Sequence, residues 1–277
     1  MKNFIRSFLL IGLFLFFTGC IDLQTTVNIN PDGSGTIEEV LFMNSAIVEI
    51  ISQFATSFSD DSTQTAEEFS LFNEDELKER EAKFGTAVQY VSGEKIEEEG
   101  KEGYRVVYSF VNVNDLIINQ NPGDKISLGN MDDGDMNEEE TGSEDNIVFQ
   151  FRPGNPAEVI INMPYAEPGE MDTSMSDESS GQDSSSLNQV MNFMKDMKIA
   201  FYVNLNGEIT ESNASYVDGS KITLLDFNFA DLFKNQEKLS LFKKKNPQSL
   251  DELKEIFKDI PGMKMEFNNP VTIKFKD

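Results

Sequence analysis

The stretch LQTTVNINPDGSGTIEEVLFM, Leu23–Met43, decides the fold predicted for this chain. From Leu23 to Ile29, apolar or threonine side chains occupy every second position, and a period of two is typical of a half-buried strand. PDGSG, Pro31–Gly35, then turns the chain, because proline presets φ and glycine supplies a positive φ. Thr36–Met43 returns as the second strand, so the sequence predicts an antiparallel hairpin.

The residues before this hairpin have the organisation of an export signal. Lys2 and Arg6 precede a continuous apolar run, Phe8–Phe17. At about 1.5 Å per residue, ten residues cross only about half of a hydrocarbon core of about 30 Å, so the run is a signal region and not a permanent span. Phe17-Thr18-Gly19-Cys20 follows it and resembles the lipobox of bacterial lipoproteins, in which the cysteine receives diacylglycerol.

Cys20 is therefore the predicted lipid attachment site. It is the only cysteine in the chain, which favours acylation over an ordinary secretory signal that happens to end in cysteine. Residues 1–19 are predicted to be removed, and acyl chains such as palmitate would hold residues 20–277 at the membrane. No linker separates Cys20 from the first strand, so the folded body is predicted to lie against the bilayer. Since Ile21 directly follows the cysteine and only Asp22 is acidic nearby, we expect the periplasmic side and not surface display. The predicted location is the outer membrane, facing the periplasm.

The charge of the exported chain excludes one class of partner. Removal of the signal leaves 21 basic and 49 acidic residues, a formal charge of 21 − 49 = −28. Such a field repels phosphate backbones, so no nucleic acid is expected to bind. The chain also lacks histidine, the commonest general base near neutral pH and the commonest metal ligand. With one cysteine it holds no disulfide, and no cofactor is expected.

The rest of the chain predicts an α+β fold, an antiparallel meandering sheet with several helices packed on one side. Asn206-Gly207 is predicted to join two strands as a hairpin. Two acidic, polar stretches near 124–145 and 167–186 are predicted to be disordered insertions in one domain, although a split into two domains near 169–186 stays open. The predicted helices are Ile47–Phe58, Glu74–Phe84 with Asn73 as its cap, Leu187–Lys198 and Leu250–Ile260. The predicted later strands are Ala87–Ile96, Tyr104–Ile118, Ile147–Phe151, Ala157–Met163, Ile199–Leu205, Glu208–Ala214, Lys221–Phe229 and Val271–Phe275.

Two short segments of the chain echo one another. Val27-Asn-Ile-Asn precedes one glycine turn, and Val203-Asn-Leu-Asn precedes another at Gly207. A degenerate duplication and a chance recurrence of hairpin chemistry both explain this echo.

Two motifs resemble a known family. Cys20, the first strand, Pro31–Gly35 and the returning strand resemble the opening of LppM-like bacterial lipoprotein domains. Gly207–Ala214 (GEITESNA) and Gly219-x-x-Ile-Thr-Leu224 are similar to that family's second signature. The resemblance implies an α+β lipoprotein domain with a lipid- or envelope-binding role, and it supplies no catalytic residues.

Three parts of the chain are candidates for a binding site: a methionine series, an acidic run and an apolar groove. Met191, Met194 and Met197 have the spacing of a thioether copper site, but a Met-rich core helix is favoured because no histidine or other cysteine completes the site. The acidic run Asp132–Glu140 lacks the spacing of an EF-hand, so no metal site is predicted. An apolar groove between sheet and helices is the remaining hypothesis, against the alternative that the same residues are simply core. Its candidate lining is Ile47, Ile51, Phe54, Phe58, Met191 and Met194.

The function predicted from sequence is that of an envelope lipoprotein with a non-catalytic binding or structural role, which binds lipid, another apolar ligand or an envelope protein. The alternative is a carboxylate-based hydrolase that acts on envelope polymers, in which two carboxylates would converge within about 5–10 Å in a cleft. The oligomeric state is not predicted.

Overall fold

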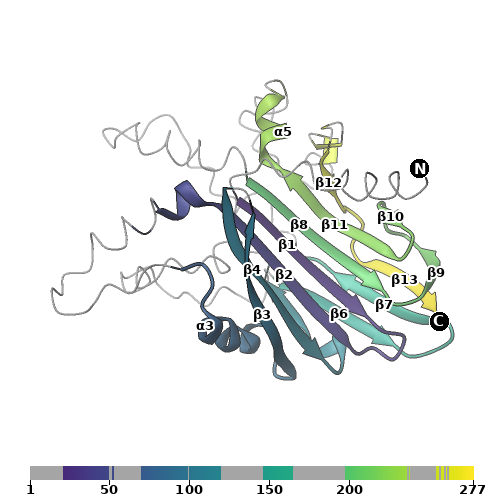
Figure 1. Cartoon of the computed structure of the whole chain (residues 1–277). Coiled ribbons are helices and arrows are strands. Elements are labelled where there is room, and N and C mark those ends of the chain that lie inside the picture. Colours follow the sequence, from purple (N-terminus) through teal and green to yellow (C-terminus); the bar gives the residue numbers. More distant parts are fainter. Residues whose placement is uncertain are drawn as a thin grey trace, which may run out of the picture.

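The computed structural model describes residues 21–49, 52, 70–98, 100–119, 146–164, 197–235, 237, 254, 255, 257, 258, 260 and 262–277. Of these residues, 56% lie in strands and 18% in helices, and the strands form two sheets. The predicted α+β fold with helices packed on one side of a single sheet is therefore wrong. Alternation predicts the strands, but it does not determine which strands pair. The strands divide into two sheets, and the second sheet covers the first (Figure 1).

Sheet A has the order β10-β11-β8-β1-β2-β4-β3, with β12 also paired to β11. Its pairs are antiparallel except for β1 and β8, which run parallel at the centre. The strands are β1 (Ile21–Ile29), β2 (Gly35–Asn44), β3 (Val88–Glu98), β4 (Lys101–Phe110), β8 (Met197–Leu205), β10 (Val217–Asp218), β11 (Lys221–Asn228) and β12 (Lys264–Met265).

Sheet B has the order β5-β6-β7-β13-β9 and is antiparallel throughout. The strands predicted at Ile147–Phe151 and Ala157–Met163 are confirmed, and they pair with each other as β6 and β7. The strands are β5 (Ile117–Asn119), β6 (Asn146–Arg152), β7 (Ala157–Asn162), β9 (Glu208–Ser212) and β13 (Val271–Lys276).

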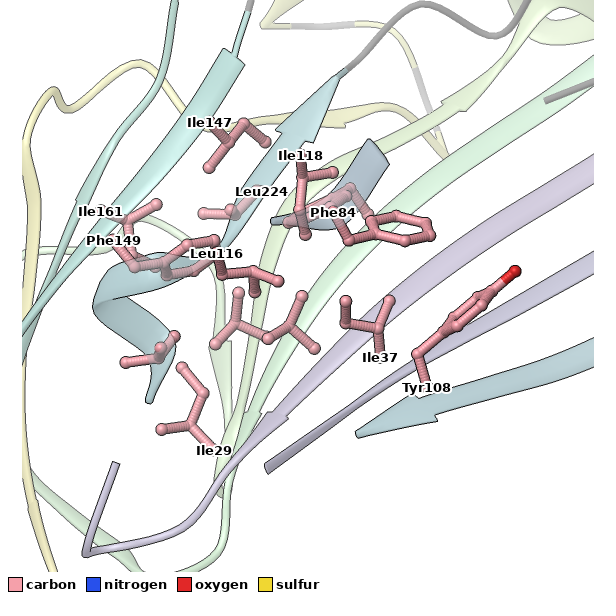
Figure 2. Close-up of a cluster of buried hydrophobic side chains, with 14 of the residues drawn as sticks. Ile29, Ile37, Phe84, Tyr108, Leu116, Ile118, Ile147, Phe149, Ile161 and Leu224 are labelled. Carbon is pink, nitrogen blue, oxygen red and sulfur yellow. The ribbon is translucent and has the colours of Figure 1, made fainter. Parts of the chain in front are cut away.

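One apolar core joins the two sheets. The alternate side chains of β1, β2 and β4 that face sheet B are buried, as are those of β6, β7 and β13. Figure 2 shows Ile29, Ile37 and Tyr108 from sheet A opposite Phe149 and Ile161 from sheet B. Burial at about 25 cal/mol per Å² of apolar surface makes this shared layer the main stabilising term of the fold.

The predicted hairpin is confirmed, and its turn is one place where the sheets meet. β1 and β2 pair from Ile21 opposite Met43 to Ile29 opposite Gly35. Gly33 has φ of 85°, and a Cβ there would lie 2.7 Å from the ring of Phe151 in β6. The Gly33 carbonyl also accepts a hydrogen bond from the Val113 N–H at 2.9 Å. Glycine is therefore required both by the turn and by the close approach of sheet B.

The two echoing segments lie side by side. Val27 pairs with Val203, and Asn28 with Asn204, in the parallel ladder of β1 and β8. Asn204 Nδ2 donates to Asn28 Oδ1 at 3.0 Å, and Asn28 Nδ2 donates to Thr36 Oγ1 at 3.1 Å. Neighbouring positions in one ladder require the same alternation of core and amide side chains, so the echo has a physical explanation without a duplication.

The helix predicted at Glu74–Phe84 is confirmed as α3 (Glu74–Glu79), which continues as the 3-10 helix η1 (Arg80–Phe84). Asn73 caps it, since its side chain accepts hydrogen bonds from the N–H groups of Asp75 and Glu76. Two further helical elements are the 3-10 helix η2 (Val113–Asp115) and α5 (Phe229–Lys234). Ser45–Glu49 is also helical, which agrees with the start of the predicted first helix.

Three predictions are wrong: the end of one strand, one hairpin and the end of one helix. Each lies where the chain changes sheet or enters a strand. The strand predicted over 104–118 ends at Phe110, and after η2 the chain joins sheet B as β5. Asn206-Gly207 is no hairpin, because β8 belongs to sheet A whereas β9 pairs with β13. Met197 and Lys198 lie in β8 and not in the predicted helix 187–198. The remainder of that helix, most of the helix 250–260 and both acidic stretches lie outside the described residues.

Candidate functional site

One end of sheet A is the place where the predicted anchor reaches the folded body. We name it the anchor end and define it by Ile21, Asn44, Lys101, Met197 and Asn228. Ile21 is opposite both Met43 and Met197, Asn44 is opposite Lys101, and Asn228 is opposite Lys198. The first strand thus starts one residue after Cys20, in the centre of the sheet and with partners on both sides.

Most of the predicted site residues lie outside the described part of the chain. This holds for Cys20 and for Ile51, Phe54, Phe58, Met191 and Met194. Ile47 is described, and it lies at the anchor end, partly buried against the core. Met197, the third methionine of the predicted series, opens β8 and also packs on the core.

The outer face of sheet A, turned away from sheet B, carries a charged cluster that extends from the anchor end toward the opposite end of β8 and β11. Tyr202 Oη donates to Asp226 Oδ2 at 2.9 Å, and Lys198 Nζ lies 3.5 Å from Asp226 Oδ1. Lys221 Nζ lies 3.3 Å from the centre of the Tyr202 ring, a cation–π contact. Asp22 neighbours Lys198 across the β1–β8 ladder and is only 7% exposed. We name Asp22, Lys198, Tyr202, Lys221 and Asp226 the outer cluster.

Burial perturbs three groups of the outer cluster. It raises the pKa of Asp22, against the opposing charges of Lys198 and Lys101. It also raises the pKa of Tyr202, and the Asp226 carboxylate beside the hydroxyl acts in the same direction. Burial lowers the pKa of Lys221, which Asp226 partly offsets. Desolvation disfavours whichever form is charged. It outweighs the opposing charges at Asp22 and Lys221, and at Tyr202 it acts together with Asp226.

The inner face of sheet A holds a buried ion pair. Glu39 of β2 is fully buried, and its carboxylate accepts a hydrogen bond from Arg80 of η1 at 2.7 Å. Arg80 also donates to Tyr104 Oη at 2.8 Å, and Thr25 donates to Glu39 Oε1 at 3.4 Å. We name Thr25, Glu39, Arg80 and Tyr104 the inner cluster. It connects the α3–η1 segment with β1, β2 and β4.

The electrostatics of the inner cluster favour the charged form of Arg80. Burial disfavours the guanidinium, but the Glu39 carboxylate and Tyr104 outweigh it and raise the pKa of Arg80. Burial raises the pKa of Tyr104 to about 12, so this hydroxyl stays protonated. Sequence reasoning missed the cluster, although a signal was present: Glu39 interrupts the apolar alternation between Ile37 and Leu41. A charge on the core face of a strand requires a partner, yet nothing in the sequence names Arg80.

Among the described residues, every buried side-chain nitrogen or oxygen has a hydrogen-bond partner. The same part of the chain contains no group of three or more acidic, histidine or cysteine side chains placed to hold a metal ion. A search of the described helices finds none with the length and apolar composition needed to cross a membrane.

Comparisons with known proteins give little. No protein-family model matches the chain, and no curated protein matches it. Among solved structures, the chain is similar to the NMR structure of the folded domain of Mycobacterium tuberculosis LppM, at 11% sequence identity and a TM-score of 0.32. The likeness covers 78% of this chain and 88% of that chain. It is a weak structural relation, in the same direction as the resemblance of the sequence motifs, and it carries no argument about function.

Proposed function

We propose that this protein is a membrane-anchored lipoprotein of the bacterial envelope with a non-catalytic binding or structural role. The observation that carries the proposal is the position of β1. The residue after Cys20 is the first residue of a central strand, 1% exposed and paired on both sides. An acyl group on Cys20 would therefore hold the β body itself at the membrane, without a tether that separates the two.

The proposed ligand is a lipid or another apolar molecule, bound along the inner face of sheet A near the anchor end. Ile47 lies three residues beyond the end of β2, and Met194 lies three residues before the start of β8. Three residues reach at most about 11 Å, so both segments of the predicted lining are attached to strands that flank Ile21. Methionine-rich faces adapt to chains of variable shape, which suits an acyl ligand.

A carboxylate-based hydrolase has no observation in its favour among the described residues. The buried carboxylates there are Asp22 on the outer face, Glu39 on the inner face and Glu266 in the loop before β13. Glu39 is held by Arg80. Glu266 accepts hydrogen bonds from the N–H groups of Phe267 and Asn268, and from the N–H and hydroxyl of Ser215. Glu39 and Glu266 are thus engaged in contacts that support the fold, which favours a non-catalytic role in this proposal.

One experiment tests anchor and ligand together. Wild type and Cys20→Ser are expressed in a bacterium that processes lipoproteins, extracted with detergent and subjected to phase partitioning and mass spectrometry. We expect wild type in the detergent phase with the mass of an acylated Cys20, and the variant as an uncleaved precursor or an unacylated exported protein. The proposal also expects lipid to copurify with the exported variant, which has no acyl chain of its own.

The lipid anchor and the apolar ligand would be refuted by two different results. A cleaved Cys20→Ser variant in the detergent phase at wild-type yield would refute the anchor. A folded variant that carries no lipid and binds no fluorescent fatty-acyl probe would refute the apolar ligand. The protein would then be a structural or protein-binding lipoprotein.

A further inference from the structure

We infer that the anchor end of sheet A, together with helix α5, is the surface that rests on the phospholipid bilayer. Sheet A would then stand on the membrane by the start of β1, with the β1–β2 turn pointing away from it. This inference rests on the proposed acylation of Cys20. It adds which side chains contact the lipid head groups.

The geometry of β1 limits how the body can be oriented. Consecutive Cα atoms are 3.8 Å apart, so Ile21 lies within about 4 Å of the Cα that carries the acyl group. Ile21 is fixed in the sheet by its pairing with Met43 and Met197. The ends of the neighbouring strands must therefore lie close to the head groups as well.

Helix α5 begins at the same level of the sheet. Asn228 ends β11 opposite Lys198, and Lys198 is opposite Asp22. Two strand spacings of about 4.8 Å separate β11 from β1, so α5 starts about 10 Å from the lipid-bearing end of β1. Figure 1 shows α5 rising from that end of β11, while the β1–β2 turn lies at the opposite end of the sheet.

The charge of this region differs from that of the rest of the chain. The described residues between 229 and 265, which run from α5 to the end of β12, contain 4 lysines and 3 acidic residues, a balance of 4 − 3 = +1. The other described residues contain 11 basic and 22 acidic residues, a balance of 11 − 22 = −11. An anionic bilayer repels the second part and not the first, so electrostatics favours the orientation that the anchor imposes.

The side chains of α5 and β12 fit a bilayer surface. Phe229 and Leu232 belong to a second apolar cluster, with Phe227, Phe257, Ile260 and Met263. Lys234 is 76% exposed at the end of α5, where its ammonium lies 3.1 Å from Asp231, and Lys264 of β12 is also exposed. Lysines bury their aliphatic stems near apolar surface and keep the charge in the head-group region, so this arrangement suits an interface.

The test compares probes at the two ends of the sheet. Because an acylated Cys20 has no free thiol, Lys234→Cys, Lys264→Cys and Asp218→Cys each provide a single labelling site in the full lipidated protein. Asp218 pairs with Lys221, and Lys221 is opposite Asn204. Asn204 lies six residues along β8 from Lys198, which is opposite Asn228 at the anchor end, so about 20 Å separates the two levels. Each labelled variant is reconstituted in phosphatidylethanolamine–phosphatidylglycerol vesicles that contain a lipid with a nitroxide on its head group.

We expect the probes at 234 and 264 to be quenched several-fold more than the probe at 218. Equal quenching at the two ends, or stronger quenching at 218, would overturn the inference while the protein still floats with the vesicles. Failure to float with the vesicles would instead refute the anchor. Circular dichroism of each variant confirms the fold, and agreement between 234 and 264 shows that the result does not depend on one substitution.

Discussion

The two faces of sheet A bury polar groups in different ways. On the inner face, Glu39 lies between Thr25 and Val106 among otherwise apolar side chains, and its carboxylate is compensated by one arginine from another element. On the outer face, Asp22, Thr26, Tyr202 and Thr223 are all less than 9% exposed, and the polar groups form ladders across neighbouring strands. One face depends on a single strong pair, whereas the other spreads its compensation over many weak contacts.

This difference predicts which single substitutions destabilise the fold most. Removing one partner of a buried ion pair leaves an uncompensated charge, which costs far more than the pair contributes. Removing one amide from a ladder loses one neutral hydrogen bond and leaves its neighbours connected. Single substitutions on the inner face should therefore destabilise the protein more than those on the outer face.

The largest expected effect comes from Arg80→Ala. This substitution leaves the Glu39 carboxylate buried without its guanidinium, and we expect the free energy of unfolding to fall by about 3–5 kcal/mol. Urea denaturation of the exported domain measures it. Lys78→Ala is the control from the same helical segment, because Lys78 forms ion pairs with Glu74 and Asp75 that are open to solvent, and stability should hardly change.

A double substitution distinguishes the cost of an unpaired Glu39 carboxylate from the loss of packing by the Arg80 side chain. Glu39→Leu with Arg80→Met replaces the pair by apolar side chains, and we expect it to recover most of the stability that Arg80→Ala loses. A loss of under 1 kcal/mol in Arg80→Ala, on the order of an exposed pair, would contradict the contrast between the two faces.

A smaller effect is expected from Asn204→Ala on the outer face. It removes the 3.0 Å amide hydrogen bond to Asn28, and we expect a loss of about 1 kcal/mol in the free energy of unfolding. Asn206→Ala is the matched control, since its bond to Asn30 is exposed and water can replace it. If Asn204→Ala destabilises the domain as much as Arg80→Ala, the neighbouring hydrogen bonds of the outer face do not compensate for the loss of one.

The smallest effect, and one of opposite sign, is expected from Asp22→Asn. Burial raises the pKa of Asp22 in the folded state above its ordinary value of 3.8, so the folded chain binds this proton more tightly than the unfolded chain. The contribution of the protonated group to stability is complete below pH 3.8 and is lost as pH rises through the folded pKa. Asparagine carries no charge at any pH, so the variant should be slightly more stable than wild type at pH 7.

The pH dependence of that difference is the measurement that checks the prediction. Denaturation curves of wild type and Asp22→Asn at several pH values should show the advantage of the variant shrinking as pH falls toward 3.8. An advantage that grows on acidification would mean that Lys198 and Lys101 outweigh burial, and that the outer cluster favours the carboxylate.

The site could be predicted only in part. The tetherless start of β1 follows from the sequence, since Cys20 directly precedes an alternating strand, and the structure confirms that β1 begins at Ile21. The inner cluster could not be predicted, because Glu39 and Arg80 are 41 residues apart and no local pattern selects one arginine as the partner. The predicted apolar lining stays a prediction, with Ile47 alone among the described residues.

The sequence by itself determined the local features of this protein: the hairpin at Pro31–Gly35, the Asn73 cap and the alternation that marks each strand. These depend on backbone preferences and on residues a few positions apart. Only the tertiary structure decided that β1 pairs in parallel with β8, and that the chain changes sheet after Phe110 and after Leu205. Alternation states which side chains share a face, but the choice of neighbouring strand depends on packing between residues as far apart as Asn28 and Asn204, which no local pattern encodes.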